Sequence, residues 1–292
     1  MPSTRTRSQA VPRPTRPHGL PDFRRPPIDE LVLSIQFGSL TKFRSGHIGV
    51  LWNEFRREYP KMTEQMPLLP AFETFGVPPQ APVSGIQIEN LLASPMSRFW
   101  FEEANGYELI QIQQDRVIHN WRKRDEQQRY PRYETIRDRF RIEVERFTKF
   151  VSDENLGEVK PNQCEVSYIN VIDLPDGENP HQYLERITPL WAGNYSEEFL
   201  LECENVSFQT RYVLREDDKP FGRVYVTFAS VFRVQDSRPV IRLEITARGR
   251  PKNASIDEAF RVLDDERKIV VRTFAAVTTP AMHELWERTD AG

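Results

Sequence analysis

The apolar patterns of this 292-residue chain occur twice in the same order. A strand-like run, an amphipathic helix, about four alternating strands and a long helix precede about Pro161, and a similar series follows it. Strands that bury one face in this way pack against helices. We therefore predict an α+β fold with two tandem lobes, residues 28–160 and 161–292, that form a curved antiparallel sheet packed on long helices. The letters of the two halves differ, so the predicted duplication depends on order alone.

The first predicted lobe starts with a nearly continuous apolar strand and ends with a long helix. Amphipathic spacing predicts a short helix that ends at Pro60, and Asn105-Gly106 predicts a hairpin turn. Residues 68–75 form an apolar segment in a proline-rich passage and fit an edge strand. The apolar positions are residues 31–37 for the first strand; Ile48, Leu51, Trp52, Phe55 and Tyr59 for the short helix; Ile86, Ile88, Phe99, Phe101, Ile110 and Ile112 for three further strands; and Tyr133, Ile136, Phe140, Val144, Phe147 and Val151 for the long helix.

The second predicted lobe has the clearest strand alternation in the chain. Asn179 and Pro180 predict the start of a short helix, and Ser255 with Glu258 predicts a capping box at the start of a long helix. Arg267 interrupts the apolar stripe of this long helix. The strands are predicted at residues 164–171, 199–203, 206–214, 224–234 and 240–247, the helix buries Phe260, Leu263, Val270, Phe274 and Val277, and Pro280 ends or kinks it.

Residues 1–27 are rich in arginine and proline, which predicts a disordered tail. The tail is either a solvated terminus or an arm that contacts nucleic acid or an acidic partner. The net charge of the whole chain is −3, which argues against a protein coated by nucleic acid or bound to a membrane surface. No secretory signal or membrane-spanning run is visible, so we expect a cytoplasmic protein.

The common catalytic and cofactor motifs are absent from the sequence, so we lean against an enzyme and expect no cofactor. Cys164 and Cys203 lie far apart and are expected to be small buried side chains, and the five histidines lack metal-ligand spacing. The acidic run Asp264-Asp265-Glu266 is expected to be a solvated helix face.

One stretch gathers an amide, an arginine and several aromatic residues where a strand meets a helix. Arg122 can form a forked pair with a carboxylate or phosphate, and aromatic rings give a large contact area at little entropic cost. The alternative is structural, with Trp121 closing the sheet end and Tyr130-Pro131 setting the helix entry. The candidate binding residues are Asn120, Trp121, Arg122, Tyr130 and Tyr133, together with Tyr168 and Asn170 on the first strand of the second lobe.

The motif Asn120-Trp121-Arg122 with Tyr130-Pro131-x-Tyr133 resembles the signature of a sporadically distributed, uncharacterised family of prokaryotic proteins. The strand Val166-x-Tyr168-x-Asn170 and the ends Pro26-Pro27-Ile28, Thr278-Thr279 and His283-x-x-Trp286 are also similar, although the family's histidine before Glu266 is replaced here. The tandem order of elements resembles the arrangement of TATA-binding proteins, which implies fold and not function. The family resemblance implies a bacterial origin and a patchy, horizontally transferred distribution.

These observations favour a non-enzymatic protein-binding module, such as an antitoxin-like or accessory factor in a bacterial defence or mobile-element locus. A small-molecule or lipid binder that uses a cleft between sheet and helices is the first alternative, and nucleic-acid binding is the next. The expected partner is thus another protein. A small ligand ranks below it and nucleic acid lower still, and no membrane contact is expected.

Overall fold

The computed structural model describes residue 17 and residues 19–76, 97–175, 177–193, 199, 203 and 205–290. The predicted strand at Ile86 and Ile88 lies outside the described residues, as does most of the one at residues 199–203. None of the described helices is long and apolar enough to cross a membrane.

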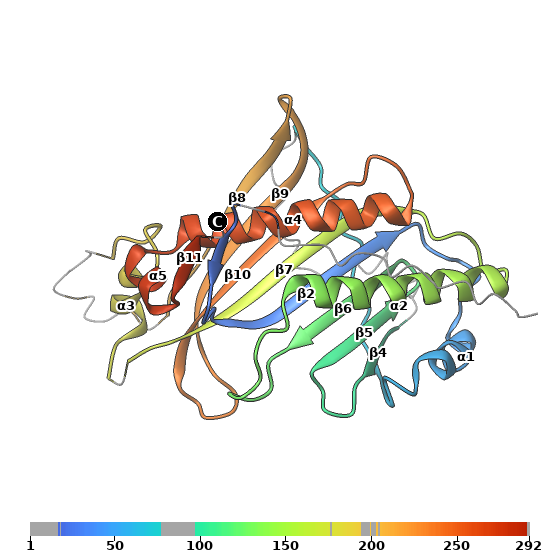
Figure 1. The fold of residues 1–292 in the computed structure, drawn as a ribbon, viewed down its shortest axis with the longest axis horizontal. Coiled ribbons are helices and arrows are strands. Elements are labelled where there is room, and N and C mark those ends of the chain that lie inside the picture. The colour runs from blue at the N-terminus through green and yellow to red at the C-terminus, as the bar shows by residue number, and fades with distance from the viewer. Residues whose placement is uncertain are drawn as a thin grey trace, which may run out of the picture.

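A nine-stranded antiparallel sheet dominates the molecule (Figure 1). Its strands are β2 (Ile28–Phe37), β3 (Lys61–Gln65), β4 (Arg98–Glu102), β5 (Glu108–Gln113), β6 (Arg116–Arg122), β7 (Pro161–Asp173), β8 (Ser207–Glu216), β9 (Lys219–Phe232) and β10 (Pro239–Gly249). Their order across the sheet is β3-β4-β5-β6-β2-β7-β10-β9-β8. Each half therefore places its first strand at the centre and its last strand next to the first, which confirms the predicted tandem α+β order.

The two halves meet at the central pair β2 and β7, where Leu33 lies opposite Val166 and Leu31 opposite Tyr168. The sheet is thus continuous from one half to the other. The described part of the chain contains no strand at the predicted position 199–203. The second half therefore contributes one strand fewer to the described sheet than the first.

Two long helices, α2 (Tyr133–Asp153) and α4 (Ile256–Val277), lie side by side on one face of the sheet (Figure 1). Both were predicted from their apolar stripes. The shorter helices are α1 (Ser45–Phe55), α3 (Pro180–Ile187) and α5 (Pro280–Leu285). As predicted, Asn179 caps α3 and Pro280 separates α5 from α4, but only half of the predicted capping box forms. The Ser255 hydroxyl accepts from the Glu258 amide at 3.1 Å, whereas the Glu258 carboxylate accepts from Lys252.

Alternate strand residues and the apolar stripes of the helices build the core between sheet and helices. In β2 the side chains of Leu31, Leu33, Ile35 and Phe37 are at most 2% exposed, and they face the helices. Burial of each side chain of this size stabilises the folded state by about 1.5–3 kcal/mol. The opposite face of the sheet carries polar side chains and is crossed by residues 66–76 instead of by either long helix.

Order begins earlier in the chain than the predicted tail allows. β1 (Pro21–Phe23) pairs antiparallel with β11 (Arg288–Asp290) in a small separate sheet. Phe23 packs edge-on against Phe274 with ring centroids 5.1 Å apart, which explains why these residues are held despite the prolines around them.

Three local predictions were wrong. Residues 68–75 form no strand, and the edge strand of this half is β3, whose side chains are largely exposed and therefore carry no apolar pattern. Cys203 is exposed, although Cys164 is buried as predicted. Glu266 is 1% exposed, because it faces the sheet opposite Gly249 and not the solvent.

Candidate functional site

β6 carries the Asn120-Trp121-Arg122 motif, and strand alternation divides the motif between the two faces of the sheet. Trp121 is 2% exposed and points to the helices, whereas Asn120 and Arg122 lie on the opposite face. The structure therefore does not bring these three side chains together.

Trp121 and Tyr133 take part in the packing between sheet and helices. The Trp121 ring meets Tyr130 edge-on with centroids 5.3 Å apart. The Tyr133 hydroxyl donates to Asp264 at 2.8 Å, and the Arg267 guanidinium lies over its ring at 5.3 Å. These contacts join the start of α2 to α4.

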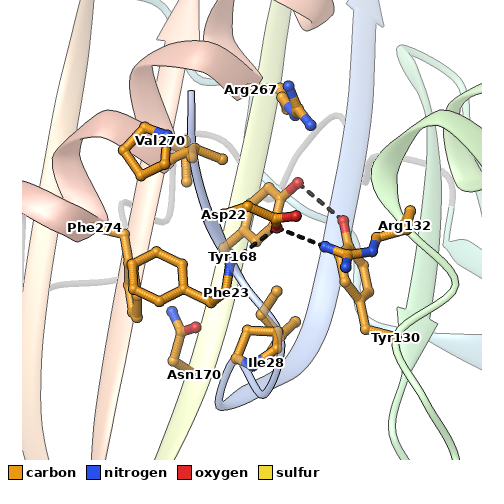
Figure 2. Close-up of a pocket in the computed structure, with 13 residues that line it drawn as sticks. Asp22, Phe23, Ile28, Tyr130, Arg132, Tyr168, Asn170, Arg267, Val270 and Phe274 are labelled. Atoms are coloured by element: carbon orange, nitrogen blue, oxygen red, sulfur yellow. Dashed lines mark hydrogen bonds and ion pairs between the residues drawn. The ribbon is translucent and has the colours of Figure 1, made fainter. Parts of the chain in front are cut away.

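Tyr130, Tyr168 and Asn170 lie together, on the helix side of the sheet, where they line a small pocket (Figure 2). The two tyrosine hydroxyls are 3.0 Å apart, and the Asn170 amide donates to the backbone oxygen of Leu243 at 3.1 Å. The pocket volume is about 50 Å³. Three of the predicted site residues thus converge, although on a different face from Asn120 and Arg122.

On the open face, a row of hydrogen bonds crosses four neighbouring strands. The Arg98 Nη1 donates to Gln111 at 2.5 Å, Gln111 donates to Asn120 at 2.6 Å, and Asn120 donates to Glu30 at 2.7 Å. Burial raises the pKa of the Glu30 carboxyl, although the hydrogen bond from Asn120 opposes this shift. Asn120 therefore has both of its polar ends satisfied within the protein.

Trp100 lies between two arginines on this face, Arg98 at 5.6 Å and Arg122 at 5.7 Å from its ring centre. Arg122 donates to Glu102 at 2.7 Å, whereas no described carboxylate pairs with Arg98. Burial lowers the pKa of the Arg98 guanidinium, and the nearby charge of Arg116 lowers it further. Both arginines therefore contact the same ring, but of the two only Arg122 is paired with a described carboxylate.

Residues 66–76, which we call the strap, cross the open face and are tied down near both ends. Gln113 holds Leu68 by two hydrogen bonds of 2.8 Å. The Gln113 side-chain oxygen accepts from the Leu68 backbone amide, and the Gln113 side-chain nitrogen donates to the Leu68 carbonyl. At the other end Glu73 is 2% exposed, and its carboxylate accepts from Tyr225 at 2.8 Å and pairs with Arg223 and Arg248. The strap therefore links the first half of the chain to strands of the second.

A cavity of about 330 Å³ lies between the strap and the sheet. The Gln163 side chain is 3% exposed, and neither end of its amide has a hydrogen-bond partner in the described part of the chain. The Arg98 Nε is also buried without a partner there. We call this space the strap cavity; its lining is Val32, Ser34, Gln36, Leu68, Leu69, Ala71, Arg98, Gln111, Arg116, Ile118, Gln163, Cys164, Glu165 and Arg248.

A second polar cavity, of about 290 Å³, shares Glu165 and Arg248 with the strap cavity. Arg248 pairs with Glu165, so the shared wall is neutralised internally. Its other lining residues are Gln209, Arg211, Tyr225, Thr227, Glu244 and Thr246. The hollowed part of the open face thus extends over strands of both halves.

His119 lies inside the protein, with no exposed surface, between two carboxylates. Its Nδ1 is 2.7 Å from Glu143 on α2, and its Nε2 is 3.2 Å from Glu108 on β5. Burial alone would lower the pKa of His119, but Glu143 and Glu108 raise it to about 9. This charged group fastens α2 to the sheet, and His119 lines none of the three described cavities.

Sequence reasoning missed Arg98, Gln163 and the strap, which line the strap cavity. Arg98 and Gln163 lie at polar positions of strands in which apolar and polar residues alternate. Solvent-facing strand residues occupy the same kind of position, so the pattern does not distinguish these two. A buried glutamine has no signal in a single sequence, because burial here depends on a strap that comes from about a hundred residues earlier in the chain. The alternation of β6 could have assigned Trp121 and its two neighbours to opposite faces.

Comparison of the sequence with models of protein families and with curated proteins finds no match in either set. The resemblance of the central motif to an uncharacterised prokaryotic family therefore stays a prediction.

Proposed function

We propose that this protein is a non-catalytic binding protein whose ligand is a small polar anion held in the strap cavity. The observation that carries the proposal is the pair of buried polar groups, the Arg98 Nε–H and the Gln163 amide, that the described residues leave unpaired. More than about 90% of buried polar groups in folded proteins have hydrogen-bond partners. A ligand in this cavity would supply the missing ones.

The charges around the cavity favour an anion. Arg116 is paired with Asp115 at 3.0 Å and Arg248 with Glu165, which leaves Arg98 as the arginine of the lining without a described carboxylate. The strap itself shows how this face holds a carboxylate, because Glu73 is bound there by two arginines and a tyrosine. A carboxylate or phosphate at Arg98 would use the same chemistry.

The amide of Gln163 adds a requirement for a second polar group, because it offers both a donor and an acceptor. The cavity volume of about 330 Å³ is roughly twice that of an engineered cavity that binds benzene, so a ligand of about a dozen non-hydrogen atoms fits. The strap covers the cavity, so a small molecule fits there better than the flat surface of another protein would.

Binding without catalysis suits the groups that face this cavity. Arginines and amides hold and orient polar ligands, and burial raises the pKa of the Cys164 thiol well above its usual value. A protonated buried thiol is a poor nucleophile. The lining therefore supports recognition of a ligand and supplies no activated nucleophile.

The test is calorimetric titration with citrate and with inorganic phosphate at constant ionic strength. Citrate has the expected size, charge and mixed polar groups. We expect citrate to bind the unaltered protein and Arg98→Gln or Gln163→Leu to weaken binding by at least about tenfold, since each removes hydrogen bonds to a charged or polar ligand.

Arg122→Gln is the matched control. Arg122 touches the same tryptophan ring as Arg98, but it is paired with Glu102 and does not line the cavity. Its substitution should leave citrate affinity unchanged. Failure of both anions to bind, or equal losses in Arg98→Gln and Arg122→Gln, would overturn the proposal.

A protein partner is the second candidate, and Trp100 favours it together with Arg98 and Arg122, which flank its ring. Tryptophan and arginine are the residue types most enriched at energetically dominant positions of protein interfaces. An antitoxin-like or accessory role in a bacterial defence or mobile-element locus would use this surface. A complex that survives gel filtration of protein purified from its host, and dissociates after Trp100→Ala, would support this candidate. An uncomplexed protein in that experiment would argue against it.

A further inference from the structure

The small pocket on the helix side lies between β1, β7, α4 and the segment before α2 (Figure 2). The strap cavity lies on the opposite face of the sheet. We propose that this pocket is a second binding site, for a short aliphatic carboxylic acid. Arg267 and the pair Tyr130 and Tyr168 would hold the carboxylate, and the apolar wall would hold the carbon chain. This inference goes beyond the proposed function and does not depend on it.

Arg267 supplies the first donor. Its side chain interrupts the otherwise apolar stripe of α4 and is only 3% exposed. One terminal nitrogen donates to Glu134 at 3.0 Å, but the Nε is buried and has no partner in the described part of the chain. A buried N–H that lacks a partner costs about 1–3 kcal/mol, more on a charged group, so an acceptor at this position would be strongly favoured.

The tyrosine pair supplies the second donor. When one of two hydroxyls 3.0 Å apart donates to the other, the accepting hydroxyl keeps its own proton for another acceptor. Burial raises the pKa of both Tyr130 and Tyr168, so both remain protonated. One free O–H and one free N–H match the two oxygens of a carboxylate.

The walls of the pocket select an aliphatic chain. Apolar side chains from two separate parts of the chain, residues 21–28 and 270–274, face one another there (Figure 2). At the edge of the pocket, Asp22 is paired with Arg132 at 2.8 Å. Because Glu134 already balances part of the Arg267 charge, a monoanion suits the site better than a phosphate dianion. The apolar lining is Pro21, Phe23, Pro26, Ile28, Val270, Val271 and Phe274.

The pocket volume limits the length of the acid. About 50 Å³ is roughly a third of the engineered cavity that binds benzene, so acetate or propionate fills it and the end of butyrate reaches the opening. Each CH₂ that becomes buried should raise affinity about fourfold, and the gain should stop when the chain leaves the pocket.

The experiment measures binding of ¹³C-labelled acetate, propionate and butyrate by NMR line broadening at constant ionic strength. We expect affinity to rise from acetate to propionate and to level off at butyrate. It should fall about tenfold in the double variant Tyr130→Phe with Tyr168→Phe, which keeps both rings and removes both hydroxyls. Val271→Trp, at the partly exposed rim, should block the pocket while leaving the core intact.

Arg98→Gln provides the control, since it alters the strap cavity alone and should not change butyrate binding. If none of the three acids binds the unaltered protein, or if the double tyrosine variant binds them as well as the unaltered protein does, the inference fails. Failure of the acids to bind would leave the citrate test of the strap cavity unchanged, because that test measures the effect of Arg98→Gln on citrate binding. The two sites are therefore tested separately.

Discussion

His119 is a charged residue in the middle of the core, and its surroundings make protein stability depend on pH. Its folded-state pKa of about 9 lies above the usual histidine value of 6.5 because Glu143 and Glu108 outweigh the effect of burial. The extra proton is bound more tightly in the folded protein than in the unfolded chain. The resulting stabilisation is complete below about pH 6.5 and is lost as the pH rises through about 9.

We therefore predict that the free energy of unfolding falls between pH 6.5 and pH 9 and that His119→Gln removes this part of the pH dependence. At pH 6 the substitution should also destabilise the fold by about 1–3 kcal/mol, because the carboxylates of Glu108 and Glu143 lose one hydrogen-bonding cation and keep Arg139. Denaturant unfolding at several pH values measures both effects. His47→Gln, on α1, should keep the original pH profile, and a parallel decline in His119→Gln would contradict the assignment.

Single residues were predictable from the sequence only where one neighbour in the chain determines their role. Asn179 and Pro180 start α3 as predicted, because a cap acts on the next turn of the same helix. The roles of His119 and Gln163 depend on groups that the fold brings from distant elements. Arg267 stood out as an interruption of a stripe, but its unpaired nitrogen became visible only in three dimensions.

Among the elements, the strap is attached to the second half of the chain mainly through one residue, Glu73. Glu73 accepts hydrogen bonds from Tyr225 and pairs with Arg223 and Arg248, while the backbone oxygen of the same residue accepts from Arg250 at 2.7 Å. The carboxylate thus holds two cations, Arg223 and Arg248, near one another. Its removal leaves them to repel each other.

We predict that Glu73→Gln speeds amide hydrogen exchange in residues 68–75 by about tenfold or more while leaving exchange in the central strands β2 and β7 unchanged. Exchange followed by mass spectrometry provides this measurement. Glu126→Gln, at an exposed position of a loop, is the control and should change neither region. Unaltered exchange in the strap of Glu73→Gln would show that other contacts hold it.

Long periodic elements were predictable, and irregular ones were not. The stripes of α2 and α4 and the alternation of β9 and β10 appear in the sequence because one face of each is buried. The strap was predicted as a strand because its residues are apolar, yet side chains and not a backbone ladder fix it to the sheet. No periodic pattern records that kind of attachment.

At the scale of the whole molecule, a continuous sheet joins both halves of the chain. The central pair β2 and β7 forms a ladder from Ile28 opposite Asn170 to Phe37 opposite Pro161, and Tyr133 and Asp264 join the two long helices above it. Neither half can lose its structure without exposing the apolar residues of this seam. The predicted order of elements was right, although the sequence alone did not show how tightly the halves would be joined.

We predict one cooperative unfolding transition for the two halves. Pulse-labelled hydrogen exchange at increasing denaturant should give the same midpoint for peptides from β5 and β6 as for peptides from β9 and β10. The helix α3 near the end of the sheet provides a comparison, because a peripheral element can open before the global transition. Two separate midpoints for the two sets of strands would show that the halves unfold independently.

The pairing of β1 with β11 has a mechanical consequence. Pro21 lies opposite Asp290, so the outer ends of both strands leave the pair at the same point and in the same direction. A force that pulls the two ends of the chain apart would therefore open this ladder one rung at a time, as a zipper, and would not shear all rungs together. Phe23 would then be drawn away from Phe274, and the wall of the small pocket would be the first part of the molecule to yield under tension.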